Sequence, residues 1–324
     1  TLGGIEVHGP DAAEFLNRMY TFAYLKQPVH RARYVLMTDQ SGVITDDGVA
    51  CRFHENHFYV TATTGGVGAV YQEMLFHNAQ WRLDVCVINS TASYAGVNIA
   101  GPKARDVLAR VSDDIDLSAE AFPYMGVRTG HIAGIPARLL RVGFVGELGY
   151  ELHHAIEHQT YLYDLLMEAG GQYGIVDFGY RALDSMRLEK AYRLWGYDMS
   201  ADYTPLEAGM DRFVNFDKGD FIGRDALLRQ RERGLERALA CLVVDAGDAD
   251  PHGYEPILSG RERIGYVASG GYGHTVEKTI VLAYLPTAYL ELGTELTVEI
   301  IGQRRAARVV AQPLYDPENQ CLLS

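Results

Sequence analysis

The chain has 324 residues, a length that one compact core usually does not hold. Of these residues 48% are hydrophobic and 22% are charged, which is ordinary for a globular protein. Its net charge of −13 argues against nucleic acid or an anionic membrane as a general partner, because both need a basic face. No apolar run approaches the roughly 18 residues of a membrane span. The four cysteines are far apart and contain no CxxC motif, so we expect neither a zinc site nor a disulfide framework, and we expect a cytoplasmic protein.

An internal repeat opens the chain. The segments "GIEVHGPDAAEFLNRM" (4–19) and "GVNIAGPKARDVLARV" (96–111) align at a constant offset. Each reads as an alternating strand, a Gly-Pro turn and an amphipathic helix. A strand that feeds a helix twice, with extended segments between, predicts two related α+β lobes. Because the chain opens inside a strand-like stretch, we also expect a longer natural polypeptide.

The middle of the chain alternates between extended and helical patterns. Residues 32–64 predict a meander of strands, 126–142 a hairpin, and 148–154 a further strand, followed by helices at about 159–169 and 178–193. From residue 235 only short strands separated by Gly and Pro remain, which predicts a small β-barrel. We therefore expect one region over 1–232 and a barrel domain over 235–318.

Two short motifs invite other interpretations. The glycines of "VTATTGGVGAV" (60–70) resemble a dinucleotide fingerprint, but its third small position falls on Tyr71, so a helix start is the better interpretation. "HAIEH" (154–158) fits a zinc pattern, but His154 ends a strand while His158 begins a helix. We expect no metal there.

Three stretches carry candidate chemistry. "GVITDDGVAC" holds Asp46 and Asp47, whose side chains point to opposite faces of a strand, so only one of them can face a cleft. "GFVGELGYEL" (143–152) places Glu151 just after a glycine-rich turn, where its carboxylate can accept two hydrogen bonds from a planar donor edge. "RLEKAYRLWGYDMSADYTPLEAGM" (187–210) combines Trp195, Tyr197 and several carboxylates around one long turn.

These stretches, together with "GYRALDSMRLEK" and "FDKGDFIGRDAL", resemble the aminomethyltransferase (glycine cleavage T-protein) family. The sequence is most similar to the folate domains of dimethylglycine dehydrogenase and of the sarcosine oxidase α-subunit. The resemblance extends from the first residue to about residue 317. It implies an α+β, three-lobed, cloverleaf-like fold that binds tetrahydrofolate in a central channel, with the C-terminal barrel as one lobe. It also implies a further N-terminal segment that helps to build the first lobe.

The resemblance also implies roles for single residues. It assigns the catalytic acid to Asp46, with Asp47 as the open alternative for the residue that faces the channel. It assigns the pterin-binding carboxylate to Glu151, with Phe144 lining the pterin where relatives have tyrosine. A folate-tail arginine of the T-proteins falls on Leu183, and Arg181 is the substitute. Trp195 and Tyr197 either line the ligand-binding channel or pack in the interface between lobes. Arg187 is expected to pair with Asp184, and Glu189 with Arg193, on the face of one helix.

The function that the resemblance implies is transfer of a one-carbon unit to tetrahydrofolate. The donor would be a methylated amine such as sarcosine or dimethylglycine, or an aminomethyl group on a lipoyl carrier protein. No flavin-binding fingerprint is present, so oxidation of an amine would need a flavoprotein partner. The alternative is a non-catalytic folate-binding or scaffold subunit of a larger flavoprotein oxidase complex.

Overall fold

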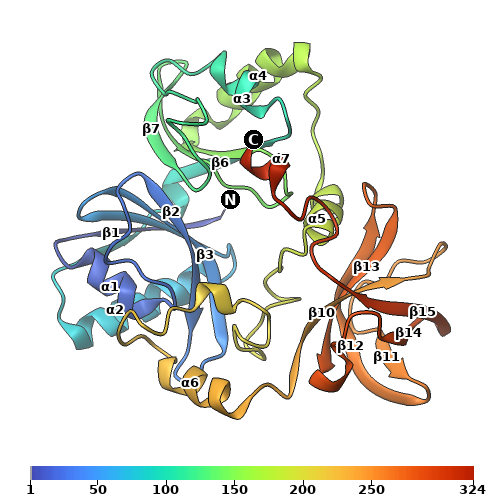
Figure 1. The fold of residues 1–324 in the computed structure, drawn as a ribbon. Helices are drawn as coiled ribbons and strands as arrows, with labels where there is room; N and C mark the ends of the chain where they lie inside the picture. The colour runs from blue at the N-terminus through green and yellow to red at the C-terminus, as the bar shows by residue number, and fades with distance from the viewer. Residues whose placement is uncertain (1) are drawn as a thin grey trace.

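The computed structural model describes residues 2–324, and Thr1 of the expected first strand lies outside them. Figure 1 shows three bodies arranged around a centre: a blue N-terminal lobe, a green second lobe and an orange-to-red C-terminal barrel. The expected α+β, three-lobed fold is thus confirmed. Within residues 2–324, no helix is long and apolar enough to cross a membrane.

The first lobe is a five-stranded sheet with helices on one face, and its strand order is β2-β3-β4-β1-β5. Phe15 and Leu16 of one helix and Val70 and Met74 of the other pack on that face around Ile5. The predicted meander is confirmed, because β2, β3 and β4 pair in sequence order. The elements are β1 (Gly3–His8), α1 (Ala12–Met19), β2 (Arg31–Thr38), β3 (Ile44–His54), β4 (His57–Ala62), α2 (Val67–Trp81) and β5 (Cys86–Asn89).

The second lobe repeats this plan with a four-stranded sheet in the order β6-β9-β8-β7. The repeat is confirmed: β1 leads into α1 as β6 leads into α3, through Gly9 (φ 139°) and Gly101 (φ 118°), a backbone region that favours glycine. The predicted hairpin is β7-β8. The elements are β6 (Tyr94–Ala100), α3 (Ala104–Ala109), β7 (Val127–Ile132), β8 (Ile135–Leu140), β9 (Gly149–Ala155) and α4 (Gln159–Gly170).

The two lobes meet through the sheet faces that their helices leave uncovered. Cys51 and Tyr59 of the first lobe share one buried cluster with Val127 and Leu140 of the second. The backbone continues this contact, since the Val127 N–H donates to the His30 carbonyl at 2.9 Å. This face-to-face packing fixes which strand residues point toward the other lobe.

Helix α5 (Tyr180–Glu189) links the second lobe to the barrel and ends four residues before the predicted boundary at 193. The helix stops because Ala191 adopts a left-handed conformation (φ 52°) and the chain turns into the loop that follows. Helix α6 (Arg224–Arg233) then precedes the barrel.

The predicted barrel is confirmed as a closed six-stranded one in the order β10-β13-β12-β11-β14-β15. Its interior is aliphatic, with Leu242, Val267, Val281 and Val298 among the fully buried residues. The strands are β10 (Arg237–Val244), β11 (Pro256–Ser259), β12 (Glu262–Gly273), β13 (Lys278–Pro286), β14 (Glu295–Ile300) and β15 (Gln303–Val310), and a short helix α7 (Gln320–Leu323) follows.

Candidate active site between the lobes

Asp46 points away from the interlobe face, toward the start of α2. Its carboxylate accepts hydrogen bonds from the Thr63 N–H (3.0 Å) and the Thr63 hydroxyl (2.6 Å). Its register partner Met37 belongs to the helix-covered core of the first lobe. Burial raises the pKa of Asp46, and the two bonds from Thr63 oppose that effect. Both carboxylate oxygens therefore have partners within the lobe.

Asp47 lies on the opposite face of β3, together with Val49 and Cys51, which contact the second lobe. The Tyr34 hydroxyl donates a hydrogen bond to its carboxylate. The pKa of Asp47 is raised to about 6. Burial is the largest cause, the Tyr34 hydrogen bond opposes it, and the nearby Asp46 carboxylate adds to it. A carboxyl group with this pKa is poised to hold or release a proton near neutral pH.

The surroundings of Asp47 are aromatic. The Tyr34 ring lies 4.7 Å from the Phe213 ring, and both pack against a cluster that contains Leu36 and Met199. The hydroxyl of Thr45, at the irregularity in the β2–β3 register before Asp46, is buried and has no hydrogen-bond partner among residues 2–324.

Glu151 reaches the interlobe space from the second lobe. Its neighbours Tyr150 and Leu152 point into the core beneath α3 and α4, so Glu151 points to the other face of β9. Its carboxylate contributes to raising the pKa of the Cys51 thiol on β3, after the larger effect of burial. Its side chain is 21% exposed, and its Oε2 lies 3.1 Å from His153 Nε2.

Glu147, the other acid of the glycine-rich turn before β9, has a different partner from Glu151. Gly146 adopts a positive φ of 79°, and the Tyr315 hydroxyl donates to the Glu147 carboxylate. The Phe144 ring stacks on Tyr192 with centroids 5.8 Å apart and an interplanar angle of 21°. Phe144 therefore lies beside the loop that follows α5.

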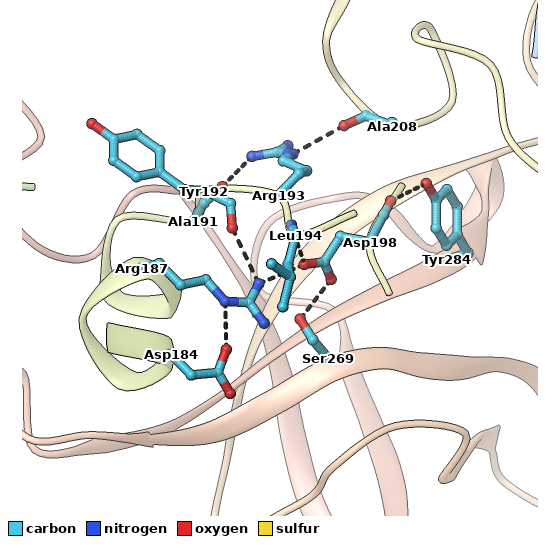
Figure 2. Close-up of polar contacts among 10 residues, drawn as sticks. All are labelled: Asp184, Arg187, Ala191, Tyr192, Arg193, Leu194, Asp198, Ala208, Ser269 and Tyr284. Atoms are coloured by element: carbon cyan, nitrogen blue, oxygen red, sulfur yellow. Dashed lines mark hydrogen bonds and ion pairs between the residues drawn. The ribbon is translucent and has the colours of Figure 1, made fainter. Parts of the chain in front are cut away.

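That loop is held by a buried ion pair, shown in Figure 2. The Arg187 guanidinium donates to Asp184 (2.7 Å) and to Asp198, and Asp198 also accepts from Ser269 of the barrel. The Tyr284 hydroxyl donates to the Asp198 carbonyl at 2.7 Å. These contacts join α5, the loop and two barrel strands at one point.

One predicted ion pair is wrong. Arg187 pairs with Asp184 as expected, but Glu189 does not pair with Arg193. Glu189 accepts instead from the backbone N–H groups of Thr275 and Val276, and Arg193 donates to the carbonyls of Ala191 and Ala208. The expected pairing needs a helix that continues to residue 193, whereas the helix ends at Glu189.

The remaining predicted site residues lie on this side of the molecule in different environments. Trp195 is partly buried and packs against Leu36 and Met199, so it forms part of the seam between the first lobe and the loop. Tyr197 is 51% exposed. Arg181 is exposed in the first turn of α5. The structure brings Trp195 close to the Asp47 face and leaves Tyr197 and Arg181 at the surface.

Sequence reasoning missed Tyr34, His153 and Tyr192. Tyr34 and Asp47 lie on separate strands, so their contact depends on the β2–β3 register, which the alternation of "ARYVLMTD" does not provide. His153 could have been predicted from the sequence, because it follows Glu151 by two residues on one strand and therefore lies on the same face.

Two other features do not belong to this site. Glu6, His8 and His57 bring three ligand atoms within 4.8 Å of one another, but Arg138 already donates to one Glu6 oxygen and His57 contacts the other, each at 2.6 Å. A surface cavity of about 740 Å³ is lined by Trp81, Lys218 and Arg224 among others, and neither Asp47 nor Glu151 lines it.

Residues 1–218 match the GCVT N-terminal domain family and residues 237–316 match the glycine cleavage T-protein C-terminal barrel domain. An aminomethyltransferase of Caldanaerobacter subterraneus is 33% identical over 97% of this chain and 83% of its own length. The chain therefore belongs to the glycine cleavage T-protein (aminomethyltransferase) family. The structure of the Bartonella henselae aminomethyltransferase T superposes with a TM-score of 0.87 at 26% identity, covering 97% of this chain and 84% of that one.

Larger proteins share the same region. Mouse mitochondrial dimethylglycine dehydrogenase is 40% identical over 71% of this chain, and the match spans only 27% of that protein's length. The sarcosine oxidase subunit alpha of Rhizobium meliloti is 34% identical over 99% of this chain and 34% of its own length.

Proposed function

We propose that this chain transfers a one-carbon unit to tetrahydrofolate bound between the first two lobes. The observation that supports the proposal is that Asp47 and Glu151 each lie on the strand face opposite the helices of their own lobe, in two sheets that share one buried cluster. In this proposal residues 1–232 form the folate-binding region and 235–318 the barrel domain.

The residues present fit a flat ligand with a polar edge. Glu151 offers a carboxylate that is 21% exposed and can accept two hydrogen bonds from the amino-pyrimidine edge of a pterin. Phe144, stacked on Tyr192, offers an aromatic wall. We keep Arg181 as the contact for the anionic folate tail, and Trp195 and Tyr197 as channel walls, on the family resemblance.

Tetrahydrofolate supplies the nucleophilic nitrogen that accepts the one-carbon unit. We assign the acid–base role to Asp47 in place of the expected Asp46, because Asp46 faces the core of its own lobe and both of its oxygens bond to Thr63. A carboxyl group with a pKa of about 6 can be ionised beside a developing positive charge and can also relay a proton. Glu151 orients the ligand, and loss of such an orienting group costs on the order of a hundredfold in rate.

The donor is proposed from the relatives. A methylated amine such as sarcosine or dimethylglycine fits the similarity to dimethylglycine dehydrogenase and sarcosine oxidase subunit alpha, and would need a flavoprotein subunit or domain to oxidise it. An aminomethyl group on a lipoyl carrier protein fits the similarity to the aminomethyltransferases. The second candidate function, a non-catalytic folate-binding or scaffold subunit of an oxidase complex, is favoured by the fact that the chain matches only 34% of the sarcosine oxidase subunit.

The test is to incubate the protein with tetrahydrofolate and each donor system and to follow the folate by mass spectrometry. The two systems are an aminomethylated lipoyl protein, and dimethylglycine with a flavin-dependent amine dehydrogenase. Accelerated gain of one carbon by the folate, lost in Asp47→Asn, would support the transferase. Folate binding with no acceleration from either donor would favour the scaffold function.

A further inference from the structure

Within residues 2–324, the Glu151 carboxylate contacts one side chain, that of His153. The two residues are two positions apart on β9, so they share a face, and Glu151 Oε2 lies 3.1 Å from His153 Nε2. The His153 side chain is 6% exposed. Glu151 Oε1 accepts no hydrogen bond from residues 2–324 and is left for a ligand.

The other nitrogen of His153 reaches across to the first lobe. His153 Nδ1 lies 3.3 Å from the hydroxyl of Tyr59 on β4, and the two rings meet edge to face with centroids 5.6 Å apart. Tyr59 is 1% exposed and belongs to the interlobe cluster. His153 thus connects Glu151 to a fixed point in the opposite lobe.

The histidine ring is confined on both sides of β9. Arg138 lies opposite His153 on β8, and its guanidinium stacks over the Tyr59 ring at 5.0 Å while it pairs with Glu6. Gly96 lies opposite on β6, where an added Cβ would be 3.9 Å from His153 Cε1. A ring held in this way has little rotamer freedom to lose when a ligand binds.

The chemistry of the three side chains determines which atom donates and which accepts in the two hydrogen bonds of His153. An ionised carboxylate only accepts, so Nε2 of His153 must donate to Glu151. In a neutral imidazole Nδ1 then accepts, and the Tyr59 hydroxyl is its donor. The order Tyr59, His153, Glu151 gives both ring nitrogens of His153 a partner and leaves the negative charge on the residue that faces the ligand.

We propose that His153 is a positioning residue for Glu151, fixing its carboxylate toward the amino-pyrimidine edge of a pterin ligand. The inference rests on the proposed function, since it deepens the role given there to Glu151. Removing the charge-assisted hydrogen bond while keeping the ring is expected to weaken ligand binding about tenfold. A side chain that keeps a donor near the Nε2 position should restore most of it.

The experiment measures the Kd of 5-formyltetrahydrofolate by calorimetry for the parent, His153→Phe, His153→Gln, Tyr59→Phe, Glu151→Gln and the double variant Glu151→Gln/His153→Phe. Binding about tenfold weaker in His153→Phe and within about threefold of the parent in His153→Gln is expected. Tyr59→Phe removes only the outer link, so a loss smaller than that of His153→Phe is expected. If His153 acts through Glu151, the double variant binds no more weakly than Glu151→Gln.

Two results would overturn the inference. Parent-like binding by His153→Phe would remove the positioning role and leave the folate site standing, as would losses in the double variant that simply add. No binding by the parent would instead remove the proposed function itself. Thermal unfolding of each variant shows whether weaker binding comes from a lost contact or from a damaged fold. If His153→Phe does not fold, Tyr59→Phe still tests whether the contacts of His153 affect binding.

Discussion

Asp46 and Asp47 are consecutive residues of β3 whose carboxylates serve opposite faces of the sheet. Asp46 accepts two hydrogen bonds from Thr63 at the start of α2, and Asp47 accepts one from Tyr34 on the interlobe side. Asp46 is therefore bonded within its own lobe, and Asp47 is the acid that we propose acts on the ligand.

Exchanging each acid for its amide should separate the two roles. Asp47→Asn is expected to lower the rate of one-carbon transfer by a hundredfold or more, on the order of a general acid–base contribution, while Asp46→Asn lowers it by less than about tenfold. Single-turnover transfer rates, corrected for the folded fraction, make the comparison. A larger loss in Asp46→Asn would return the catalytic role to Asp46.

The raised pKa of Asp47 predicts how stability depends on pH. The folded-state pKa of about 6 exceeds the ordinary value of 3.8, so the folded protein holds this proton more tightly than the unfolded chain. Between about pH 4 and pH 6 this group makes stability fall as pH rises, and above pH 6 the ionised form costs at most about 3 kcal/mol.

Asp47→Asn should therefore raise the free energy of unfolding at pH 8 by roughly 2 kcal/mol and change it little at pH 4. Denaturant titrations at both pH values measure the difference. The amide keeps an oxygen for the Tyr34 hydroxyl, so the hydrogen bond serves as an internal control. Equal effects of the substitution at the two pH values would contradict the assigned burial of the charge.

Gly66 fits because it has no side chain. A Cβ there would lie 2.2 Å from Asp46 Oδ2 and 2.4 Å from Thr63 Oγ1, atoms held together by a hydrogen bond. Gly66→Ala should thus cost about 1–3 kcal/mol of stability by overpacking. The neighbouring Gly65 has nothing within 4 Å of an added Cβ, so Gly65→Ala, expected within about 0.5 kcal/mol of the parent, is the matched control. Similar unfolding midpoints for both variants would be inconsistent with the packing around Asp46.

The buried pair of Arg187 and Asp198 should matter more than a surface pair. Both side chains are at most 1% exposed, so Asp198→Asn leaves a buried guanidinium short of a charge partner and should cost about 3–5 kcal/mol. Glu14→Gln breaks the Arg18–Glu14 pair, whose side chains are 38% and 34% exposed, and should cost less than about 1 kcal/mol. Chemical denaturation of both variants tests the ranking, which fails if Glu14→Gln proves the more damaging.

Local pattern was sufficient for the lobes and the barrel but not for contacts between elements. The Gly-Pro turns of the repeat and the short strands separated by glycine after residue 235 can be recognised from short stretches of sequence. The structure contains both. Alternation on one strand shows that Asp46 and Asp47 oppose each other, but only the placement of α2 shows which face is covered. The absence of the expected Glu189–Arg193 pair depends on the partners that Glu189 finds instead, which lie 86 and 87 residues away.

The most direct test of a folate site between the lobes is calorimetric titration of 5-formyltetrahydrofolate, a stable mimic of the loaded cofactor, into the parent and Glu151→Ala. Micromolar binding by the parent and a loss of about a hundredfold or more in the variant is the predicted result. Failure of the folded parent to bind, or equal binding by parent and variant, would contradict the site.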